Sequence, residues 1–447
     1  MRALEKNTIA AIATASGNGA IGIIRLSGPQ ARTIAEGLTG SVLQPRYAHL
    51  TTFTSNDGVV IDSGLSLYFP APNSFTGEDV VELQGHGGQY VLRALLNDCI
   101  KRGARLANPG EFSERAFHNE KIDLLQAEAI ADLIAAETET AAHLAAASLS
   151  GTFSSIVTEL SLQLTELRAL TEASIDFPEE EIDVISRHNV LDRLHGLLET
   201  LQKLTEEVAA AQQLSQGINV ALMGPPNAGK SSLLNALAQE EVAIVTNQAG
   251  TTRDIVTRSV LINGLGIDLV DTAGLRETTD EIEAEGILRA KSAATRADLI
   301  LEIQDDYAQE TGEPIDISRS SQIIRVINKI DLSGRDPGIA KEADIPTVAI
   351  STLTGAGLDQ LQQLITETAL TSSTTNSRFS ARHRHVTALK EAKTALITSL
   401  SNYENHNAAE LLSEDLKNVQ ARLDELTGVI TSDDILGQIF SSFCIGK

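Results

Sequence analysis

The segment at residues 224–231, which reads GPPNAGKS, holds the residues with the clearest chemistry in this chain of 447 amino acids. It matches G-x-x-x-x-G-K-[ST] and stands between an apolar run at 218–223 and a helical pattern that begins at 232, the context that a phosphate-binding loop requires. Backbone N–H groups of such a loop surround phosphate oxygens, Lys230 reaches the β- and γ-phosphates, and Ser231 ligates Mg²⁺. These residues predict a nucleoside triphosphate site.

Three further segments follow in the order that a GTP-hydrolysing domain uses. Asp271 ends an apolar run in the sequence DTAG, where it can hold Mg²⁺ through water while the N–H of Gly274 meets the γ-phosphate. Asp331 closes the sequence NKID, and its carboxylate can accept two hydrogen bonds from the edge of guanine, which adenine does not offer. The segment 351–353, STL, would support the base. The set predicts GTP rather than ATP.

The sequence GTTRD at 250–254 predicts a switch that responds to the γ-phosphate, with Thr252 completing the Mg²⁺ shell. A Ras-like enzyme orients water with a glutamine at the position of Leu275, so this site alone should hydrolyse GTP slowly. Arg253 and Arg276 could supply charge in cis, although surface or switch roles are favoured for both. Another group must therefore stabilise the transition state.

Asn227 offers one source of that charge. Its side-chain oxygen could hold a monovalent cation against the β- and γ-phosphates, where an arginine would otherwise reach. The alternative is an asparagine that only stabilises the loop.

The patterns around these motifs predict a multidomain chain of α+β and α/β type. Residues 1–118 form an α+β module with strands at 21–26 and 80–83 and a helix at 90–100, and residues 119–216 are helical. A β-α alternation fills 217–378, and helices return at 379–447. The favoured organisation is one helical domain with the α/β unit inserted into it; two separate helical domains are the alternative.

Composition limits the functions that are possible. The formal net charge is −25 and there is no tryptophan, which argues against a large sequence-independent grip on nucleic acid and against base stacking. No apolar run is long enough to span a membrane, and two cysteines make a disulfide framework improbable. We therefore expect a reduced, cytoplasmic protein that contacts RNA locally or through a partner.

The chain resembles the MnmE (TrmE) family of bacterial tRNA-modification GTPases over nearly its whole length. Besides the nucleotide motifs, the resemblance rests on GEDVVE at 77–82, HGG at 86–88, GEFSERAF at 110–117 and KIDLLQAEA at 121–129, together with the final CIGK. Few families combine a GTPase inserted among helices with this terminal tetrapeptide.

The resemblance implies a fold, a reaction and partners. It implies an N-terminal α+β tetrahydrofolate-binding domain, an all-α helical domain and a Ras-like P-loop G domain inserted into the helical domain. It implies a homodimer whose G domains are activated by K⁺-dependent dimerisation, and an FAD-containing partner, MnmG, in a heterotetramer or larger complex. The reaction would add an aminomethyl or carboxymethylaminomethyl group to C5 of the wobble uridine, U34, from a 5-formyl or 5,10-methylene folate.

The resemblance also assigns residues. Arg25, Glu82, Lys121 and Lys447 would line the folate site, and Glu283 would orient the attacking water, although its pattern alone reads as a solvated acidic face. K⁺ would be held by Asn227, Thr246, Gln248 and Thr251, and Mg²⁺ by Ser231 and Thr252. The full set of nucleotide contacts would be Asn227, Ala228, Gly229, Lys230, Ser231, Ser232, Thr246, Asn247, Gln248, Ala249, Gly250, Thr251, Thr252, Asp271, Thr272, Ala273, Gly274, Asn328, Lys329, Asp331, Ser351, Thr352 and Leu353.

Two residues keep more than one interpretation. Cys444 lies four residues from the end, but Gly446 and Lys447 fit a prenylation signal poorly, so a free thiol with a local, catalytic task is favoured over lipidation. His86 could be catalytic, but a loop-capping or folate-contacting role is favoured.

Two other functions compete with the tRNA-modification GTPase. A ribosome-assembly switch GTPase uses the same nucleotide motifs, but it usually attaches a basic RNA-binding module and this chain is acidic. A folate-dependent aminomethyl transferase with a merely regulatory G domain is the other.

Overall fold

The computed structural model describes residues 7–176, 187–225, 227–240, 257–271, 297–307, 322–342, 345–370, 377–406, 408–429 and 433–441, together with Phe443 and Gly446. The chain forms two compact units. One contains residues 1–131, 154–161 and 420–447, and the other contains 132–153 and 162–419.

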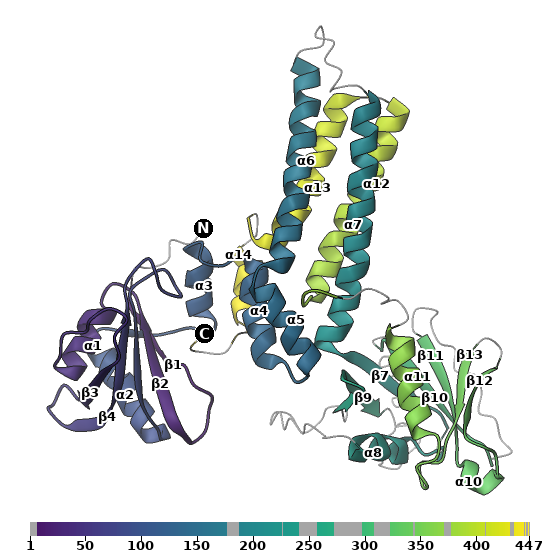
Figure 1. Ribbon diagram of the computed structural model, residues 1–447, viewed down its shortest axis with the longest axis horizontal. Coiled ribbons are helices and arrows are strands. Elements are labelled where there is room, and N and C mark those ends of the chain that lie inside the picture. The colour runs from purple at the N-terminus through teal and green to yellow at the C-terminus, as the bar shows by residue number, and fades with distance from the viewer. Residues whose placement is uncertain are drawn as a thin grey trace, which may run out of the picture. The chain divides into compact units, whose positions relative to one another are not determined.

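A six-stranded sheet forms the centre of the first unit (Figure 1). Its strands run in the order β3-β4-β5-β2-β1-β6, and only the β1–β6 pair is parallel. The strands are β1 (Ile9–Ile12), β2 (Gly19–Ser27), β3 (His49–Thr54), β4 (Val60–Phe69), β5 (Val80–Gly87) and β6 (Arg105–Leu106). Helices α1 (Ala31–Thr39) and α2 (Gln89–Lys101) pack on the sheet.

The two faces of this sheet differ because side chains alternate along each strand. Ile24 and Leu26 of β2 and Leu83 of β5 join a buried cluster with α1 and α2, so both helices cover one face. The intervening residues Arg25 and Glu82 therefore belong to the opposite face, which is only partly buried. The expected α+β module, with its strands and the helix at 90–100, is confirmed.

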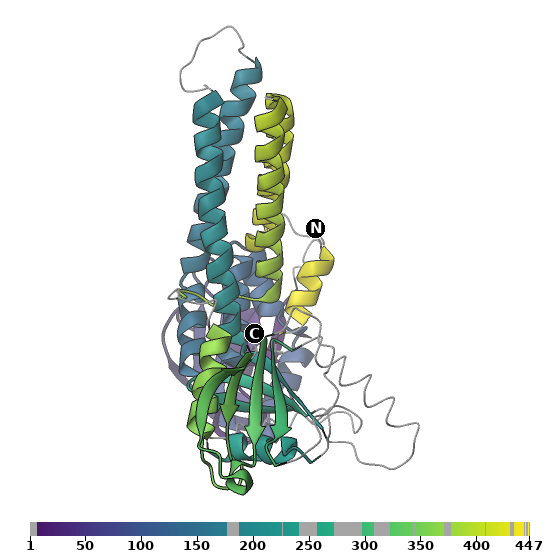
Figure 2. The same cartoon turned by 90° about the vertical axis from the view of Figure 1, so that its right-hand side faces the viewer.

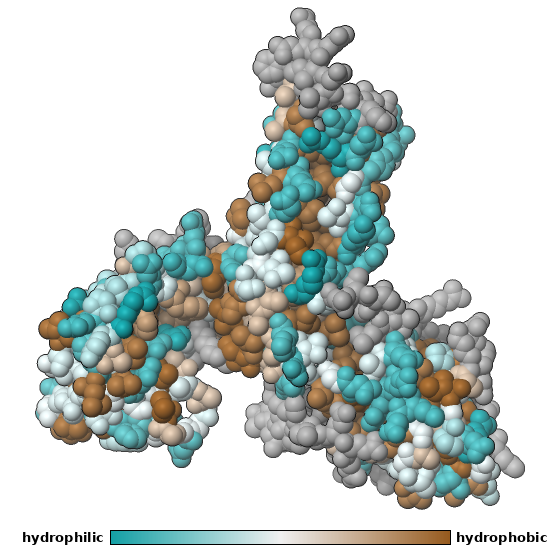
Figure 3. All heavy atoms as spheres, in the orientation of Figure 1, coloured by the Kyte–Doolittle hydropathy of each residue, from teal (hydrophilic) through white to brown (hydrophobic). Residues whose placement is uncertain are grey.

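Large apolar side chains remain exposed along one edge of the sheet. Leu50 of β3 is 82% exposed, and Val59 and Val60 at the start of β4 are each 64% exposed. Figure 3 shows apolar and polar side chains interspersed on the visible face of this unit. A strand edge with exposed apolar side chains is suited to contact with another protein surface.

The C-terminal part of the chain returns to the first unit. Phe440 and Phe443 pack with Leu124 and Ala127, which joins α14 (Asp433–Ser441) to α4 (Leu124–Ala135), and α14 also contacts α3 (Glu111–His118). Gly446 lies against the end of β1, where an added Cβ would stand 2.3 Å from the carbonyl oxygen of Ile12. Gly446 is thereby held beside the first strand.

Long helices dominate one part of the second unit and lie side by side in both ribbon views (Figures 1 and 2). They are α5 (Glu139–Leu149), α7 (Arg187–Gln216) and α12 (His383–His406), together with the parts of α6 (Thr152–Asp176) and α13 (Ala409–Thr427) that lie within 162–419. Helix α7 packs along α12, and Phe153 stacks on Phe379 with ring centroids 4.3 Å apart. Helices before and after the α/β unit therefore share one core, as predicted, and the alternative of two separate helical domains is wrong.

The α/β unit is built on a seven-stranded sheet in the order β12-β13-β11-β10-β7-β9-β8. The central strands are parallel, whereas the edge strands β8 and β12 pair antiparallel. The strands are β7 (Ile218–Met223), β8 (Thr257–Ile262), β9 (Leu265–Asp271), β10 (Leu299–Asp305), β11 (Gln322–Asn328), β12 (Gly338–Glu342) and β13 (Ile345–Ala349). The helices are α8 (Lys230–Glu240), α10 (Ile330–Ser333) and α11 (Leu358–Leu370).

The long helix α7 joins this sheet through one residue. Gly217 separates Gln216, the last residue of α7, from Ile218, the first of β7, and has φ +75°. An added Cβ on Gly217 would lie 2.4 Å from the carbonyl oxygen of Gly266, so the joint needs glycine. In the part of the chain that the structure describes, no helix is long and apolar enough to cross a membrane.

Candidate functional site

The phosphate-binding loop lies at the carboxyl end of β7, between β9 and β10. Neighbouring strands are added on both sides of β7, so the strand order changes direction at this point. In open α/β sheets, such a change creates the crevice in which ligands bind. The ends of β9, β10, β11 and β13 meet at the same edge, because these strands are parallel to β7 or to one another. Asp271, in register with Leu222, therefore stands beside the loop.

Two glycines let the loop pack closely on neighbouring strands. Gly224 has φ +146°, and an added Cβ would lie 2.2 Å from the carbonyl oxygen of Ile303 in β10. Gly229 has φ +99°, and its added Cβ would lie 2.2 Å from Nδ2 of Asn328. A side chain at either position would push the loop off the sheet.

Lys230 is buried, with 7% of its surface exposed. Its Nζ donates to the carbonyl oxygens of Gly224 at 2.7 Å and Pro225 at 2.8 Å, so the ammonium lies within the curve of the loop. Ser231 and Ser232 follow as exposed residues in the first turn of α8. The partial positive charge of a helix N-terminus and the lysine together favour an anion at this place.

The fully buried Asn328 connects three segments of the site. Its Nδ2 donates to the carbonyl oxygen of Ala228 in the loop at 2.9 Å, and its Oδ1 accepts from the N–H of Thr352 at 3.2 Å. The residue that the sequence places in the guanine motif thus also ties the phosphate loop to the segment after β13.

The carboxylate of Asp331 is oriented by a neighbouring hydroxyl. The buried Ser351 donates from Oγ to Oδ1 of Asp331, and the same Oγ accepts from the N–H of Thr354 at 3.2 Å. Lys329 lies next to this pair with φ +68°, and its Nζ is 2.6 Å from Oδ2 of Asp305. The predicted guanine motif and the segment 351–353 therefore form one corner of the site, with Leu353 83% exposed at its rim.

A second polar arrangement lies on the open face of the N-terminal sheet. Arg25 and Glu82 face each other across β2 and β5, with Nε and Nη2 of the arginine 3.0 and 2.8 Å from Oε1 of the carboxylate. The guanidinium also lies 5.8 Å from the ring centroid of Phe75 and 5.9 Å from that of Phe112. Since Arg25 contacts only Oε1, the second oxygen of Glu82 remains directed to other donors, among which Gln84 lies at 3.5 Å.

The loop that carries Phe75 also contacts Lys121. An added Cβ on Gly77 would lie 3.3 Å from Cδ of Lys121, so the aliphatic stem of the exposed lysine rests on this loop. Three of the four residues assigned to folate thus border the sheet face or the loop above it. The fourth, Lys447, lies outside the described residues, but its neighbour Gly446 is fixed against β1.

Comparison with known proteins decides the family. The family model described as "MnmE helical domain" matches residues 124–444, and the model described as "GTP-binding protein TrmE N-terminus" matches residues 8–121. The chain belongs to the MnmE family of tRNA modification GTPases. Proteins named "tRNA modification GTPase MnmE" from Pseudomonas aeruginosa (strain UCBPP-PA14) and Marinomonas sp. (strain MWYL1) are 49% and 47% identical to it. These matches cover 98% and 100% of this chain and 99% of each relative.

Several residues that the MnmE resemblance assigns lie outside the described residues. They are Thr246, Asn247, Gln248, Ala249, Gly250, Thr251, Thr252, Thr272, Ala273, Gly274, Glu283, Cys444 and Lys447. Asn227, the other residue assigned to K⁺, is exposed and has φ +65°.

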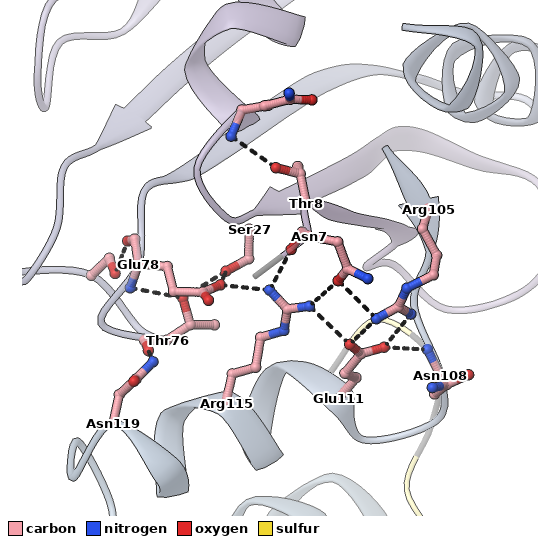
Figure 4. A network of polar contacts seen from close by, with 12 residues as sticks. Asn7, Thr8, Ser27, Thr76, Glu78, Arg105, Asn108, Glu111, Arg115 and Asn119 are labelled. Atoms are coloured by element: carbon pink, nitrogen blue, oxygen red, sulfur yellow. Dashed lines mark hydrogen bonds and ion pairs between the residues drawn. The ribbon is translucent and has the colours of Figure 1, made fainter. Parts of the chain in front are cut away.

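Sequence reasoning missed a buried polar network under the loop at 74–79 (Figure 4). Arg115, 1% exposed, donates to Glu78 at 2.9 Å, to Glu111 at 3.0 Å and to the carbonyl oxygen of Asn7 at 2.9 Å. Ser27 at the end of β2 donates to the same Glu78 carboxylate at 2.7 Å. The network therefore fixes the loop at 74–79 against β2 and α3. The only signal of this network in the sequence was the segment GEFSERAF at 110–117, and that segment does not reveal which charged side chains form pairs.

Glu111 is the most strongly bonded carboxylate of this network. Arg105 contacts both of its oxygens, at 2.8 and 2.6 Å, and the N–H of Asn108 donates to it at 2.8 Å. Burial would raise the pKa of Glu111, but the hydrogen bonds from Arg105, Asn108 and Arg115 outweigh burial and hold that pKa below its usual value. The carboxylate is thus ionised at neutral pH.

Proposed function

We propose that this chain hydrolyses GTP to drive modification of the wobble uridine of tRNA, adding an aminomethyl or carboxymethylaminomethyl group to C5 of U34. The one-carbon unit would come from a tetrahydrofolate derivative on the N-terminal sheet, and an FAD-containing partner, MnmG, would perform the redox steps. The proposal is supported above all by one observation: Arg25 and Glu82 form an open polar pair in a chain that also carries a guanine-nucleotide corner.

The residues of the nucleotide site fit GTP with Mg²⁺. Asp331, oriented by Ser351, offers the acceptor that guanine requires, and the buried Lys230 offers charge to the phosphates. Ser231 and Thr252 would ligate Mg²⁺, and Asp271 would reach it through water. Thr252 would also couple the γ-phosphate to the switch.

Hydrolysis would use a monovalent cation in place of a catalytic arginine. Asn227, Thr246, Gln248 and Thr251 would surround K⁺, which supplies positive charge next to the β- and γ-phosphates. Glu283 would orient the attacking water, because Leu275 cannot. The exposed position of Asn227 within the phosphate loop is compatible with this role.

The N-terminal face fits a reduced folate. A carboxylate can accept from the amino group and the ring N–H of a pterin, and Glu82 has an oxygen that Arg25 does not occupy. The rings of Phe75 and Phe112 beside Arg25 supply flat apolar surface. Lys121 and Lys447 would meet the anionic tail, and Cys444 would act close to the one-carbon group.

We further propose a cytoplasmic homodimer that binds MnmG in a heterotetramer or larger complex. The exposed apolar side chains of Leu50, Val59 and Val60 supply a surface for self-association. Because the net charge is −25, most phosphate contacts with tRNA would come from the partner. We assign the domains to residues 1–118, 119–216, 217–378 and 379–447.

Mass analysis of wobble uridines from cells that lack this gene tests the proposal. We expect U34 without its C5 group, restored by the wild-type gene and not by Glu82→Gln or Asp331→Asn. Asp57→Asn, at an exposed carboxylate in the turn between β3 and β4, serves as the matched control for the loss of a charge. Unchanged nucleosides in the deletion strain would reduce the protein to a GTPase of another purpose.

A further inference from the structure

A cavity of about 320 Å³ opens on the helix-covered side of the N-terminal sheet, between the end of β1 and α2. Its floor is apolar and includes Ile12, Leu92 and Leu96, which belong to the core beneath the two helices or pack against it. The cavity therefore lies on the sheet face opposite to the one that carries the Arg25–Glu82 pair, and it is separate from the proposed folate site.

Small residues form one wall of this cavity. They are residues 14–17, TASG, in the turn that follows β1, and an added Cβ on Gly17 would meet no atom within 4 Å. The other wall is the flank of α2, where Leu92 packs so closely on β2 that an added Cβ on Gly22 would lie 2.5 Å from its Cδ2. A helix fixed on the sheet and a turn of small residues thus enclose the space.

Three polar side chains stand at the mouth of the cavity. Ser16, Gln89 and Arg93 line it and are exposed, and among the described residues their side chains form no hydrogen bond or ion pair. The hydroxyl and the amide can each donate and accept, and the guanidinium offers several N–H donors. An apolar floor bordered by a few polar groups is typical of a pocket that binds a small ring system.

The surroundings of the cavity are positively charged, although the chain as a whole has a net charge of −25. The lining segments 12–17 and 89–96 contain no carboxylate. The only carboxylate of α2, Asp98, is 3% exposed and held in an ion pair at 2.6 Å. Arg93 and the exposed Lys101 lie two turns apart, about 12 Å along the helix. This side of α2 therefore suits two anionic groups joined by a short chain.

An aromatic ring adjoins the same surface. Tyr90 is 84% exposed and precedes Arg93 by three residues, so the two side chains are neighbours on the helix. An exposed tyrosine offers a flat face on which a nucleobase stacks. An acidic peptide would supply anions for Arg93 and Lys101, but it would bring no ring for the cavity or for the tyrosine. A nucleotide strand supplies both, so the observations favour RNA over an acidic protein.

We infer that this cavity and the adjoining side of α2 bind single-stranded RNA, with one unpaired base in the cavity and the flanking phosphates on Arg93 and Lys101. The family consists of tRNA modification GTPases, and the loops of a tRNA present unpaired bases that can leave the stack. Paired bases cannot enter the cavity. The site involves neither the folate face nor the partner, so it stands independently of the proposed chemistry at U34.

Fluorescence anisotropy of the full chain with a labelled oligouridine strand, measured over a range of salt concentrations, tests the phosphate contacts. Two contacts predict that log Kd rises with log salt with a slope of about 1.4. Arg93→Gln and Lys101→Gln should each weaken binding and lower the slope by about 0.7. An RNA duplex of the same length should bind more weakly than the single strand.

Lys390→Gln is the matched control for the loss of one positive charge, because Lys390 is exposed on α12 in the other unit. This variant should bind the strand as wild type does. Equal weakening by Lys390→Gln would mean that net charge, and not this side of α2, governs binding. That result, an unchanged slope in Arg93→Gln, or a wild-type chain that does not bind the strand would each overturn the inference.

A second pair of variants tests the base in the cavity. Ala15→Phe places a ring in the cavity without changing the charge, and it should weaken binding of the strand by about tenfold. A strand of the same length without bases should bind this variant and the wild type equally. Ala146→Phe, at an exposed alanine of α5, should bind both strands as wild type does. Equal weakening of both strands by Ala15→Phe, or of neither, would overturn the assignment of the cavity.

Competition distinguishes RNA from an acidic protein surface. The unlabelled strand should displace the labelled one, whereas polyglutamate with the same number of charges should displace it much less. Equal displacement by polyglutamate would indicate an acidic protein partner for α2 and overturn the inference. None of these outcomes alters the expected loss of the C5 group from U34 in cells that lack the gene, so the inference and the proposed function fail separately.

Discussion

Asn328 donates from Nδ2 to the carbonyl oxygen of Ala228 over 2.9 Å, which joins the guanine corner to the phosphate loop through one buried side chain. The same amide accepts from the N–H of Thr352, so the loop cannot shift without disturbing the segment that supports the base. Recognition of the base and of the phosphates is therefore structurally coupled within the described part of the site.

Asn328→Ala should weaken GTP and GDP binding by about tenfold to a hundredfold, because it leaves a buried carbonyl and a buried N–H unsatisfied at a cost of about 1–3 kcal/mol. Calorimetry of the full chain with each nucleotide measures the change. Asn263→Gly, in the turn between β8 and β9 at the opposite end of the strands, is the control and should bind normally. Equal affinities for Asn328→Ala and wild type would contradict the coupling.

Hydrolysis of GTP should be faster in K⁺ than in Na⁺ by roughly tenfold, because the cation supplies charge that the site otherwise lacks. Asn227→Ala should remove the difference and leave the slow rate in Na⁺ unchanged. Phosphate release measured at matched ionic strength tests both statements. Identical rates in the two salts would remove the cation site.

Gly446→Ala should weaken folate binding by about tenfold. Its φ of +102° and the 2.3 Å approach of an added Cβ to the Ile12 carbonyl oxygen would strain the backbone by about 1–3 kcal/mol and displace Lys447. Fluorescence titration with a reduced folate measures the loss. Gly437→Ala in α14 meets no atom within 4 Å and should bind as wild type does. If both variants bind equally well, the tail does not contribute to the site.

Glu111→Gln should destabilise the first unit by about 3–5 kcal/mol at neutral pH, because it breaks a buried set of ion pairs. The pKa of Glu111 is held below its usual value, so its stabilising effect is present above that value and is lost as pH falls through the lowered pKa. Urea unfolding measures the difference in free energy of unfolding between the variant and the wild type. This difference should be smaller below pH 4 than at neutral pH. A difference in free energy of unfolding that does not change with pH would mean that Glu111 stabilises the unit by packing and not by its charge.

Patterns of short range predicted much of this molecule. The strand at 218–223, the loop at 224–231 and the helix after them are recognised by local sequence, and the helical pattern predicted for 119–216 includes α7. Their periodicity is decided by neighbouring residues, so it can be read without knowing the fold.

Contacts across long separations could not be predicted in the same way. Arg25 meets Glu82 only because β2 and β5 pair in one particular register, and Asp62 reaches His86 only because β4 and β5 separate after Leu65. Neither condition leaves a periodic signal in either segment. The loop-capping role favoured for His86 from its glycine neighbours does not describe the observed contact, since its ring bonds to a carboxylate from another strand.

Only one residue, Gly217, connects helix α7 to strand β7, so the helix and the sheet are joined without a flexible linker. A helix of 30 residues ends one residue before the strand that carries the phosphate loop, and Gly217 is wedged against Gly266. A tilt of the sheet on nucleotide exchange would therefore move α7 with it. The end of the helix farthest from the sheet would move the greatest distance. Inserting a few flexible residues at Gly217 would uncouple movement of the α/β unit from movement of α7 while leaving both folded.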